Sequence, residues 1–486
     1  MNLIQATLLP LAALALALLP GCATNPVTGD QDFVLMSESD EIHLGQQYNQ
    51  QILKEMPAYN DPELAAYVDT VGQRIARHSH RPELDYHFTV IDSDTVNAFA
   101  LPGGYIYVTR GIMAYLNSEA ELAAVLGHEI GHITARHSVR QQSAATVSGV
   151  AGAVLGAATG IPGSQDLFNT LGKAMLSGYG RDHELESDRL GAEYLARTGY
   201  DPQAMLEVIG VLKNQELYEK ERARREGREA QSYHGVFASH PENDQRLQEV
   251  VKAAERFKPV GTPLVGRENY LERLEGLAYG PRASEGIVAG SRFYHQALDF
   301  ALDFADGWSI TNQPERLLAV APGQAALLEV TVSQRPAQLA PRQYLEEHGA
   351  HNPQRGESLS MAGFDTYTAV ARVSTNLGER DGRFAVLYDG DHAFMFTGVS
   401  REPDDLASFD SRFLAVARSF RRLDAAEKRR AAGLRLHLVE ATTDIPFETL
   451  VQQSPMDRDA DTRLRLLNGL YPDLEPRPGQ TLKTVR

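Results

Sequence analysis

The sequence has very little cysteine and no excess of positive charge. Its 486 residues include one cysteine and one tryptophan, and 64 Asp and Glu outnumber 47 Lys and Arg, giving a formal net charge of −17. One cysteine cannot form an internal disulfide or a site with several cysteine ligands, so a bound metal would need His and carboxylate ligands. An acidic chain without a concentrated basic face repels phosphate, which argues against a nucleic-acid-binding protein.

The composition is otherwise that of a globular protein. Apolar residues make up 43% and charged residues 23% of the chain, and these fractions exclude a disordered or fibrous protein. No repeat of fixed period is present. At about 100–200 residues per domain, the length predicts roughly two to four domains.

A short apolar segment at the start of the chain predicts export from the cytoplasm. Residues 8–19 are almost entirely Leu and Ala, and Pro20, Gly21 and Cys22 follow directly. This order is typical of a secretory signal, and it resembles a bacterial lipoprotein signal, in which the cysteine is lipidated and begins the mature protein. The segment departs from such signals in having no Lys or Arg and in having Pro20 where a small residue is usual. A membrane anchor or plain secretion is the alternative, although so short a run is at the lower limit for spanning a bilayer.

Ala23 after the cysteine, rather than Asp, resembles lipoproteins that are sorted to the outer membrane. We therefore expect residues 1–21 to be a signal peptide. The mature chain would be attached to the outer membrane through lipid on Cys22 and would face the bacterial periplasm.

Residues 22–257 are predicted to form one α+β domain, mainly helical with a small sheet. Ser118 and Glu121 have capping-box spacing, and apolar residues recur at helical spacing after them. The other predicted elements are helices at residues 37–53, 61–77, 182–197 and from 201, and strands at 88–92 and 98–109.

Residues 143–165 contain no charged side chain and are rich in Gly, Ala and Val. A close-packed helix, a mobile lid and a loop that dips into a membrane all have such a composition. We favour protein that is packed or mobile over a membrane segment.

The C-terminal part is predicted to contain two further domains after a linker at residues 258–286, which is rich in Pro and Gly. Residues 287–425 combine four β-rich segments with a helix at 404–419, which indicates a separate α+β domain with Trp308 in its core. This segment resembles small PsbP-like domains. Residues 434–486 read as strand, helix, helix and strand, and they resemble a LysM module, which implies contact with peptidoglycan; a plain packing subdomain is the alternative.

A metal-binding pattern lies within the helix that begins near Ser118. His128, Glu129 and His132 form the pattern His-Glu-x-x-His. Residues i and i+4 share a helix face, so both imidazoles can reach one Zn²⁺ at about 2.0–2.1 Å, with Glu129 directed toward its open side. A catalytic zinc needs a third protein ligand and one open position. Another element must therefore supply a carboxylate or an imidazole.

The predicted helix at residues 182–197 offers two candidates for the third ligand. Glu184 and Asp188 are one turn apart on the same face, so Glu184 can bind the metal while Asp188 hydrogen-bonds a ligating imidazole. Glu186 is the rival and faces a different direction. Spacing alone favours Glu184 without excluding Glu186.

Several stretches resemble metallopeptidase family 48, the zinc endopeptidases that include CAAX prenyl proteases and bacterial heat-shock membrane proteases. The resemblance covers about residues 35–255. It is carried by residues 97–104, the motif at His128, residues 184–189, and Ser239-His240-Pro241 with Arg246. It implies a gluzincin-type domain with one Zn²⁺ per chain, bound by His128, His132 and Glu184. Unlike the integral-membrane members, the chain lacks several spanning segments, so it resembles the envelope-facing branch.

The resemblance also implies roles for two further residues. His240 would line the zinc site or block it before substrate binds, and Arg246 would help to stabilise the oxyanion. We expect the activity to be hydrolysis of peptide bonds in misfolded or misassembled envelope proteins, with Glu129 as general base. A different hypothesis is an envelope scaffold or chaperone-like protein with a latent protease domain, since His240 as a fourth ligand would close the open position.

The predicted strand at Tyr105, Ile106, Tyr107 and Val108 could pair with an extended substrate by β-augmentation; an ordinary edge strand of a small sheet is the alternative. His78, His80 and His87 flank the predicted sheet without metal-binding spacing, so we expect surface or packing roles for them. His137 and His183 lie close to the candidate ligands in sequence and could support them by hydrogen bonds, but we expect solvated or structural roles.

Overall fold

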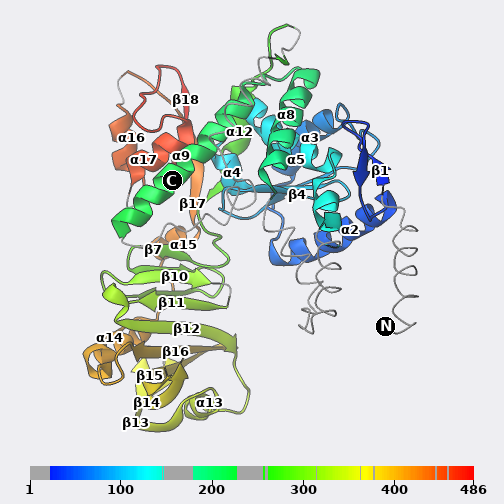
Figure 1. Cartoon of the computed structure of the whole chain (residues 1–486). Helices are drawn as coiled ribbons and strands as arrows, with labels where there is room; N and C mark the ends of the chain where they lie inside the picture. The colour runs from blue at the N-terminus through cyan, green and yellow to red at the C-terminus, as the bar shows by residue number, and fades with distance from the viewer. Residues whose placement is uncertain are drawn as a thin grey trace, which may run out of the picture. The chain divides into compact units, whose positions relative to one another are not determined.

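The computed structural model describes residues 22–144, 146, 179–226, 256–257, 261–313, 315–361, 363–375, 378–443, 446–456 and 459–486. The predicted signal peptide, most of residues 143–165, His240 and Arg246 lie outside these ranges. The chain divides into two compact units (Figure 1): Met1–Tyr279 with Arg435–Arg486, and Gly280–Leu434. The second unit is therefore an insertion between two parts of the first. Both contain helices and strands, which confirms the α+β class.

The first unit begins with a hairpin and two helices. Its elements up to residue 76 are β1 (Cys22–Thr24), β2 (Gln31–Phe33), α2 (Glu38–Glu55) and α3 (Pro62–Ala76). Ser37 caps α2 by accepting a hydrogen bond from the Asp40 N–H, and Asp61 caps α3 in the same way through the Leu64 N–H. Both helices begin where their capping residues predict, because each cap satisfies an N–H that has no partner within the helix.

A three-stranded sheet lies beside these helices. It consists of β3 (His87–Ile91), β4 (Ala98–Leu101) and β5 (Tyr105–Thr109), in the order β3-β5-β4. The central strand β5 pairs with β3 in parallel and with β4 in antiparallel orientation. Tyr105, Ile106, Tyr107 and Val108 are thus buried between two partners, which corrects their predicted role as a substrate-binding strand. Among the described residues, β4 has one partner strand and is the edge nearest the helix that carries the histidine motif.

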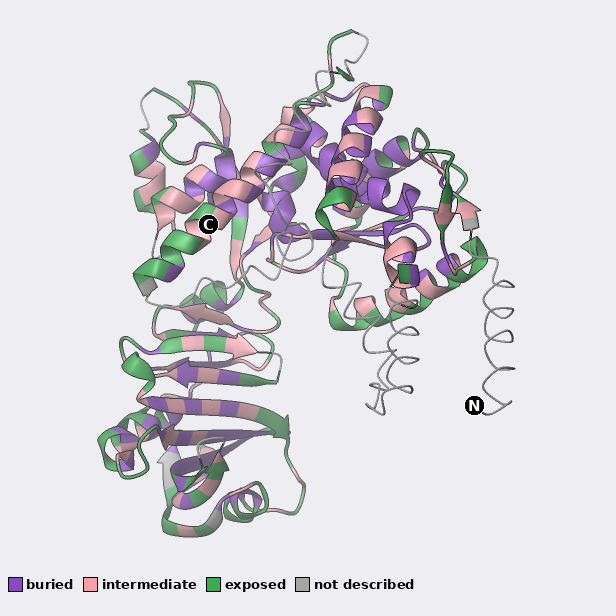
Figure 2. Cartoon of the chain, viewed as in Figure 1, coloured by how far each residue is buried: buried purple, intermediate pink, exposed green. Residues whose placement is uncertain are grey.

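Three helices pack together in the first unit: α5 (Glu119–Thr134), α8 (Arg181–Thr198) and α9 (Ala204–Glu226). Helix α5 is almost entirely buried (Figure 2). Glycine at position 131 favours the close approach of α8, because a Cβ there would lie 3.0 Å from the Cα of Ser187 and one of the two helices would have to shift. Gly131 inside the histidine motif therefore lets the carboxylates of α8 come near the imidazoles.

The segment predicted as a linker contains ordered structure. Helix α12 (Arg267–Leu274) buries Tyr270, Leu271 and Leu274, and β6 (Ala278–Tyr279) follows it. This corrects the linker predicted at residues 258–286. The apolar side chains of α12 pack into the first unit, whereas the Pro and Gly residues on which the prediction rested mark only its ends.

The C-terminal segment has the predicted order of strand, helix, helix and strand. Its elements are β17 (Leu434–Glu440), α16 (Phe447–Gln453), α17 (Ala460–Asn468) and β18 (Thr481–Val485). The sheet order β18-β17-β6 joins this segment to the first unit, and the buried Lys483 donates hydrogen bonds to the carbonyls of Ala114 (2.7 Å) and Leu116 (2.6 Å). This corrects its prediction as a separate domain. Its likeness to LysM remains a prediction.

The second unit is built on an antiparallel sheet of seven strands in the order β10-β11-β12-β16-β15-β14-β13. The sheet strands and their helices are β10 (Ser309–Gln313), β11 (Arg316–Val320), β12 (Ala326–Gln334), α13 (Pro341–Glu347), β13 (His351–Met361), β14 (Phe364–Thr375), β15 (Gly378–Asp389), β16 (His392–Ser400), α14 (Leu406–Arg418) and α15 (Ala425–Ala431). A smaller sheet contains β7 (Ile287–Ala289), β8 (Arg292–His295) and β9 (Phe300–Asp303).

Alternate residues of β15 pack on opposite faces of the large sheet. Ala385 and Leu387 belong to the core that includes Phe413 of α14, whereas Phe384 belongs to the core beneath α13. Trp308 lies in the α14 core, with its ring centroid 6.0 Å from that of Phe413, which confirms its packing role. The period of two along β15 explains how one strand supplies both cores.

Within the described ranges, none of the helices combines the length and the apolar character needed to cross a membrane.

Candidate metal centre

Helix α5 presents the histidine motif from a buried position. Ser118 caps the helix by accepting a hydrogen bond from the Glu121 N–H, as the sequence predicts. The Glu121 carboxylate accepts hydrogen bonds from the Asn117 N–H (2.9 Å) and from the Ser118 hydroxyl (3.4 Å). Because the first turn is held in this way, the orientation of the later turns is fixed, and His128 and His132 face the same direction.

The structure brings His128, His132 and Glu184 together. Their candidate ligand atoms all lie within 4.8 Å of one another. The two Nε2 atoms are 3.0 Å apart, and the Glu184 carboxylate oxygens lie 3.5 Å from Nε2 of His128 and 3.4 Å from Nε2 of His132. All three side chains are buried. Two imidazole nitrogens and a carboxylate oxygen are a donor set that suits Zn²⁺.

Asp188 and Glu129 both lie beside His128. Asp188 Oδ1 lies 2.8 Å from Nδ1 of His128, the ring nitrogen opposite the cluster. Glu129 is 2% exposed and shares the wall of a cavity with His128. Glu186, the rival of Glu184, contacts neither imidazole of the motif in the described contacts; its carboxylate accepts a hydrogen bond from His137 (3.0 Å) instead.

The cavity beside the motif is small and apolar. Its volume is about 30 Å³, close to the space of one water molecule. His128, Glu129 and Asp188 supply its polar edge. The remaining lining residues are Ala98, Ile112, Ala124, Val125, Met205, Val208, Ile209 and Leu212. A carboxylate on the wall of an apolar cavity is placed to act on a group that binds there.

His137 is not the solvated residue that was one expectation from the sequence, and it has the position of the alternative, a group beside a candidate ligand. It is fully buried, and its Nδ1 lies 2.9 Å from Nδ1 of His132. The ring of His183 stacks on His137 with centroids 4.2 Å apart. Helical periodicity could not reveal this contact, because α5 ends at Thr134 and the chain turns before His137.

The other predicted histidines lie away from the cluster. His80 is half-buried and contacts the Tyr194 hydroxyl (2.7 Å), and His78 contacts the backbone carbonyl of Arg74 (2.9 Å). His87 is exposed and stacks on Tyr105. These contacts confirm packing or surface roles.

Burial lowers the pKa of the two motif histidines, and the neighbouring carboxylates raise it. Burial lowers the pKa of His128, but its contacts with Asp188 and Glu184 outweigh this and raise the pKa to about 9. Burial holds the pKa of His132 well below its usual value, despite the opposing effect of Glu184. An imidazole must be neutral to bind a metal, so metal binding would release a proton from this site.

The two imidazoles, the carboxylate on a neighbouring helix and the adjacent Glu129 define a zinc metalloendopeptidase domain of the His-Glu-x-x-His class. Residues 62–254 match the model of peptidase family M48, so this segment is a domain of that family.

Curated relatives are similar over part of the chain. The beta-barrel assembly-enhancing protease of Yersinia pestis is 31% identical over 263 residues, covering 52% of this chain and 51% of the relative. The mitochondrial metalloendopeptidase OMA1 of Schizosaccharomyces pombe is 32% identical over 185 residues, covering 37% of this chain and 54% of the relative. The chain therefore spans about half the length of the curated relatives it matches.

A solved structure of cyanobacterial PsbP from Synechocystis covers 28% of this chain and 95% of its own, with 16% identity and a TM-score of 0.23. The PsbP-like character of residues 287–425 remains a prediction.

Proposed function

We propose that the chain is a zinc-dependent endopeptidase that hydrolyses peptide bonds in misfolded or misassembled proteins of the bacterial envelope. The observation that carries this proposal is the buried cluster of His128, His132 and Glu184 beside Glu129. Zinc bound there would polarise the scissile carbonyl and make a water molecule more acidic.

The residues of the chain have separate tasks in this reaction. His128, His132 and Glu184 hold the metal, and Asp188 orients His128 through its Nδ1. Glu129 takes a proton from the attacking water and passes it to the leaving amine. The apolar wall of the cavity limits access of other water molecules to the reacting groups. Arg246 and His240 keep their predicted roles, in stabilising the oxyanion and in restraining access.

The sheet suggests how a substrate chain is held. Strand β4 is the edge nearest α5, and an extended peptide can add to such an edge through main-chain hydrogen bonds. Main-chain pairing depends little on side-chain sequence. This property suits an enzyme that acts on many unfolded proteins.

The cellular setting is part of the same proposal. Lipid on Cys22 would hold the chain at the outer membrane, facing the periplasm. Relatives that carry the name beta-barrel assembly-enhancing protease support a role in the envelope. Contact of residues 434–486 with peptidoglycan is a further part of the proposal, and binding of the purified chain to isolated peptidoglycan tests it.

The decisive experiment is cleavage of casein by the purified mature chain, with and without a zinc chelator. We expect cleavage that stops with chelator, returns with added zinc and is absent in Glu129→Gln, while Glu129→Gln still binds one zinc. Glu193→Gln is the matched control, because Glu193 is a carboxylate on α8 that pairs with Arg189 and Arg197 away from the cluster. Faster cleavage by His240→Ala would support a restraining role for His240.

Two results would contradict the proposal. A chain that binds no zinc at stoichiometric level has no metal centre of the proposed kind. A chain that binds zinc but cleaves nothing, with a cellular phenotype that survives Glu129→Gln, would favour the scaffold or chaperone-like alternative.

A further inference from the structure

A continuous set of polar contacts leads away from His132 on the side opposite the candidate metal position. Nδ1 of His132 lies 2.9 Å from Nδ1 of His137, and Nε2 of His137 lies 3.0 Å from Oε2 of Glu186. The same Glu186 oxygen accepts a hydrogen bond from Arg140 (3.3 Å). Arg140 also lies 3.5 Å from Asp32, which belongs to β2 of the N-terminal hairpin. Three side chains thus connect His132 to Asp32, which lies 100 positions earlier in the chain.

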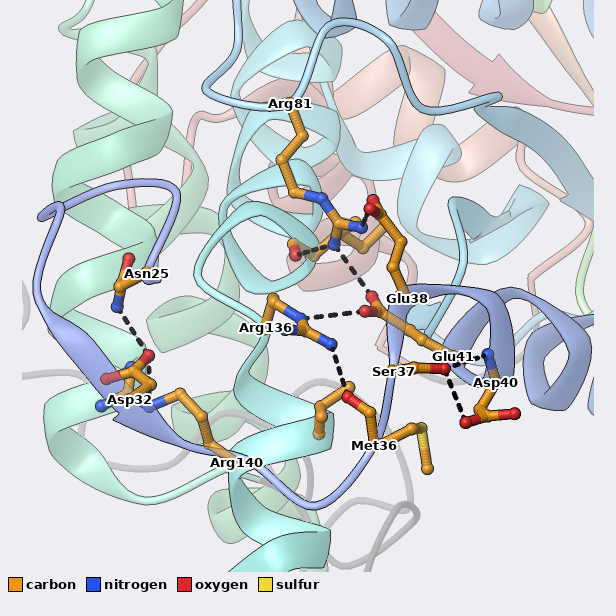
Figure 3. A network of polar contacts seen from close by, with 12 residues as sticks. Asn25, Asp32, Met36, Ser37, Glu38, Asp40, Glu41, Arg81, Arg136 and Arg140 are labelled. Atoms are coloured by element: carbon orange, nitrogen blue, oxygen red, sulfur yellow. Dashed lines mark hydrogen bonds and ion pairs between the residues drawn. The ribbon is translucent and has the colours of Figure 1, made fainter. Parts of the chain in front are cut away.

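The backbone between the two histidines is held in an unusual conformation. Arg136 has a φ of +55°, in the left-handed region that residues other than glycine rarely adopt. Its guanidinium donates to Glu41 (2.9 Å) and to the Met36 carbonyl (3.2 Å), as Figure 3 shows. Residues 137–144 are helical again after this turn. The contacts of Arg136 therefore stabilise the turn that directs His137 back toward His132.

The hydrogen bonds assign one proton to each ring. Nε2 of His132 faces His128 and Glu184, so as a metal ligand His132 must carry its proton on Nδ1. That proton is donated to Nδ1 of His137, which must accept it and therefore carries its own proton on Nε2. The Nε2 proton is donated to the Glu186 carboxylate. His137 is thus neutral and bonded on both sides.

We propose that His137, held by Glu186, is a positioning residue that fixes the ring orientation and the tautomer of His132 for metal binding. This inference rests on the proposed metal centre. The two ligand histidines are then held differently: His128 bonds directly to a carboxylate, Asp188, whereas His132 reaches its carboxylate through a second imidazole. Such supporting bonds typically change metal affinity by about 10–100-fold.

Two substitutions of His137 separate its two bonds. Asn places its side-chain oxygen near the Nδ1 position, so His137→Asn keeps an acceptor for His132 and loses the donor to Glu186. Gln reaches the Nε2 position, so His137→Gln keeps a group beside Glu186 and loses the acceptor for His132. His43→Asn and His43→Gln are matched controls, because His43 is an exposed residue of α2.

The quantity to measure is the zinc dissociation constant, obtained by competition with a chelator of known affinity. All variants are made in the Glu129→Gln background, so the test does not depend on enzymatic activity. We expect His137→Gln to weaken zinc binding by about 10–100-fold and His137→Asn to weaken it by less than about fivefold. Glu186→Gln should fall between them, while the His43 variants and Glu193→Gln match the parent. Melting temperatures of the metal-free variants show whether each one folds.

Equal zinc affinity in His137→Asn and His137→Gln would overturn the proposal, whether both match the parent or both are equally weak. If His137→Gln does not fold, Glu186→Gln decides, since Glu186 is half-buried and tolerates the change; zinc affinity equal to that of Glu193→Gln would then overturn the proposal. If the parent protein binds no zinc, the proposed function is contradicted as well. If the parent binds zinc normally and the variants bind it with the same affinity, only the proposed role of His137 is contradicted.

Discussion

Asp188 Oδ1 lies 2.8 Å from Nδ1 of His128, one helical turn beyond Glu184, so a single face of α8 supplies both a candidate ligand and the group that orients another. At this distance the carboxylate can accept the Nδ1 proton, which would leave Nε2 with its lone pair toward the metal position. Asp188 is 1% exposed, so water cannot replace it easily.

The first prediction concerns this contact. Asp188→Ala is expected to weaken zinc binding by about 10–100-fold, because His128 loses the bond that fixes its tautomer. Chelator competition measures the effect. Asp182→Ala is the matched control, since Asp182 is an exposed residue in the first turn of the same helix. Equal zinc affinity in the two variants would show that Asp188 does not orient His128.

The second prediction concerns the buried carboxylate of Glu41, which bonds to Nη1 of Arg81 and to Nε of Arg136, both at 2.9 Å (Figure 3). Glu41→Ala leaves two buried guanidinium groups without this partner and is expected to lower the free energy of unfolding by about 3–5 kcal/mol. Urea denaturation monitors the loss. Glu38→Ala is the control, because Glu38 pairs with Arg81 from the surface and should cost about 1 kcal/mol or less.

The third prediction concerns the C-terminal strand. Lys483→Met removes the donor to the carbonyls of Ala114 and Leu116, which precede the helix that carries the motif. Buried acceptors without partners typically cost about 1–3 kcal/mol. We expect a lower melting temperature than for Lys220→Met, a control at an exposed position of α9. A melting temperature equal to that of the control would mean that the C-terminal strand does not support this unit.

The fourth prediction concerns pH. Burial raises the pKa of Glu121 to about 7, against the opposing effect of the Asn117 N–H, whereas its ordinary value is 4.5. Between these values the folded protein retains a proton that the unfolded chain releases, so Glu121 stabilises the fold below pH 4.5 and this contribution is lost as pH rises toward 7. Each pH unit in this window corresponds to about 1.4 kcal/mol for the one group.

Glu121→Gln removes this titration. The unfolding free energy of the wild type should therefore decline relative to that of Glu121→Gln as pH rises from about 4.5 to 7, and urea denaturation across this range measures the difference. Parallel pH profiles of the two proteins would contradict the assignment.

The helices that the sequence predicts correctly are specified by residues that lie close to one another in the chain. Ser37, Asp61 and Ser118 cap helices at the predicted positions, and His128 and His132 share a face because they are four residues apart on a helix. Capping and helical spacing act over three or four residues, so they can be read directly from the sequence.

The position of the sheet strands could not be read in the same way. A run such as Tyr105–Thr109 predicts a strand, but its place in the middle of the sheet depends on pairing with β3 and β4. Likewise, residues 434–486 show their order of strand, helix, helix and strand locally, while the buried contact of Lys483 with Ala114 joins segments 369 positions apart. Composition near residues 258–286 carries no information on such contacts.

The candidate ligands on α5, the two carboxylates one turn apart on α8 and the helices that carry them follow from spacing in the chain. Packing in three dimensions places Glu184 toward the imidazoles and Glu186 toward His137, because this depends on how closely α8 packs against Gly131. It also decided that His137 turns back to His132, since the left-handed residue Arg136 is stabilised by Glu41 from another helix. Local patterns specify which side chains share a helix face, and packing between distant segments decides which residues that face contacts.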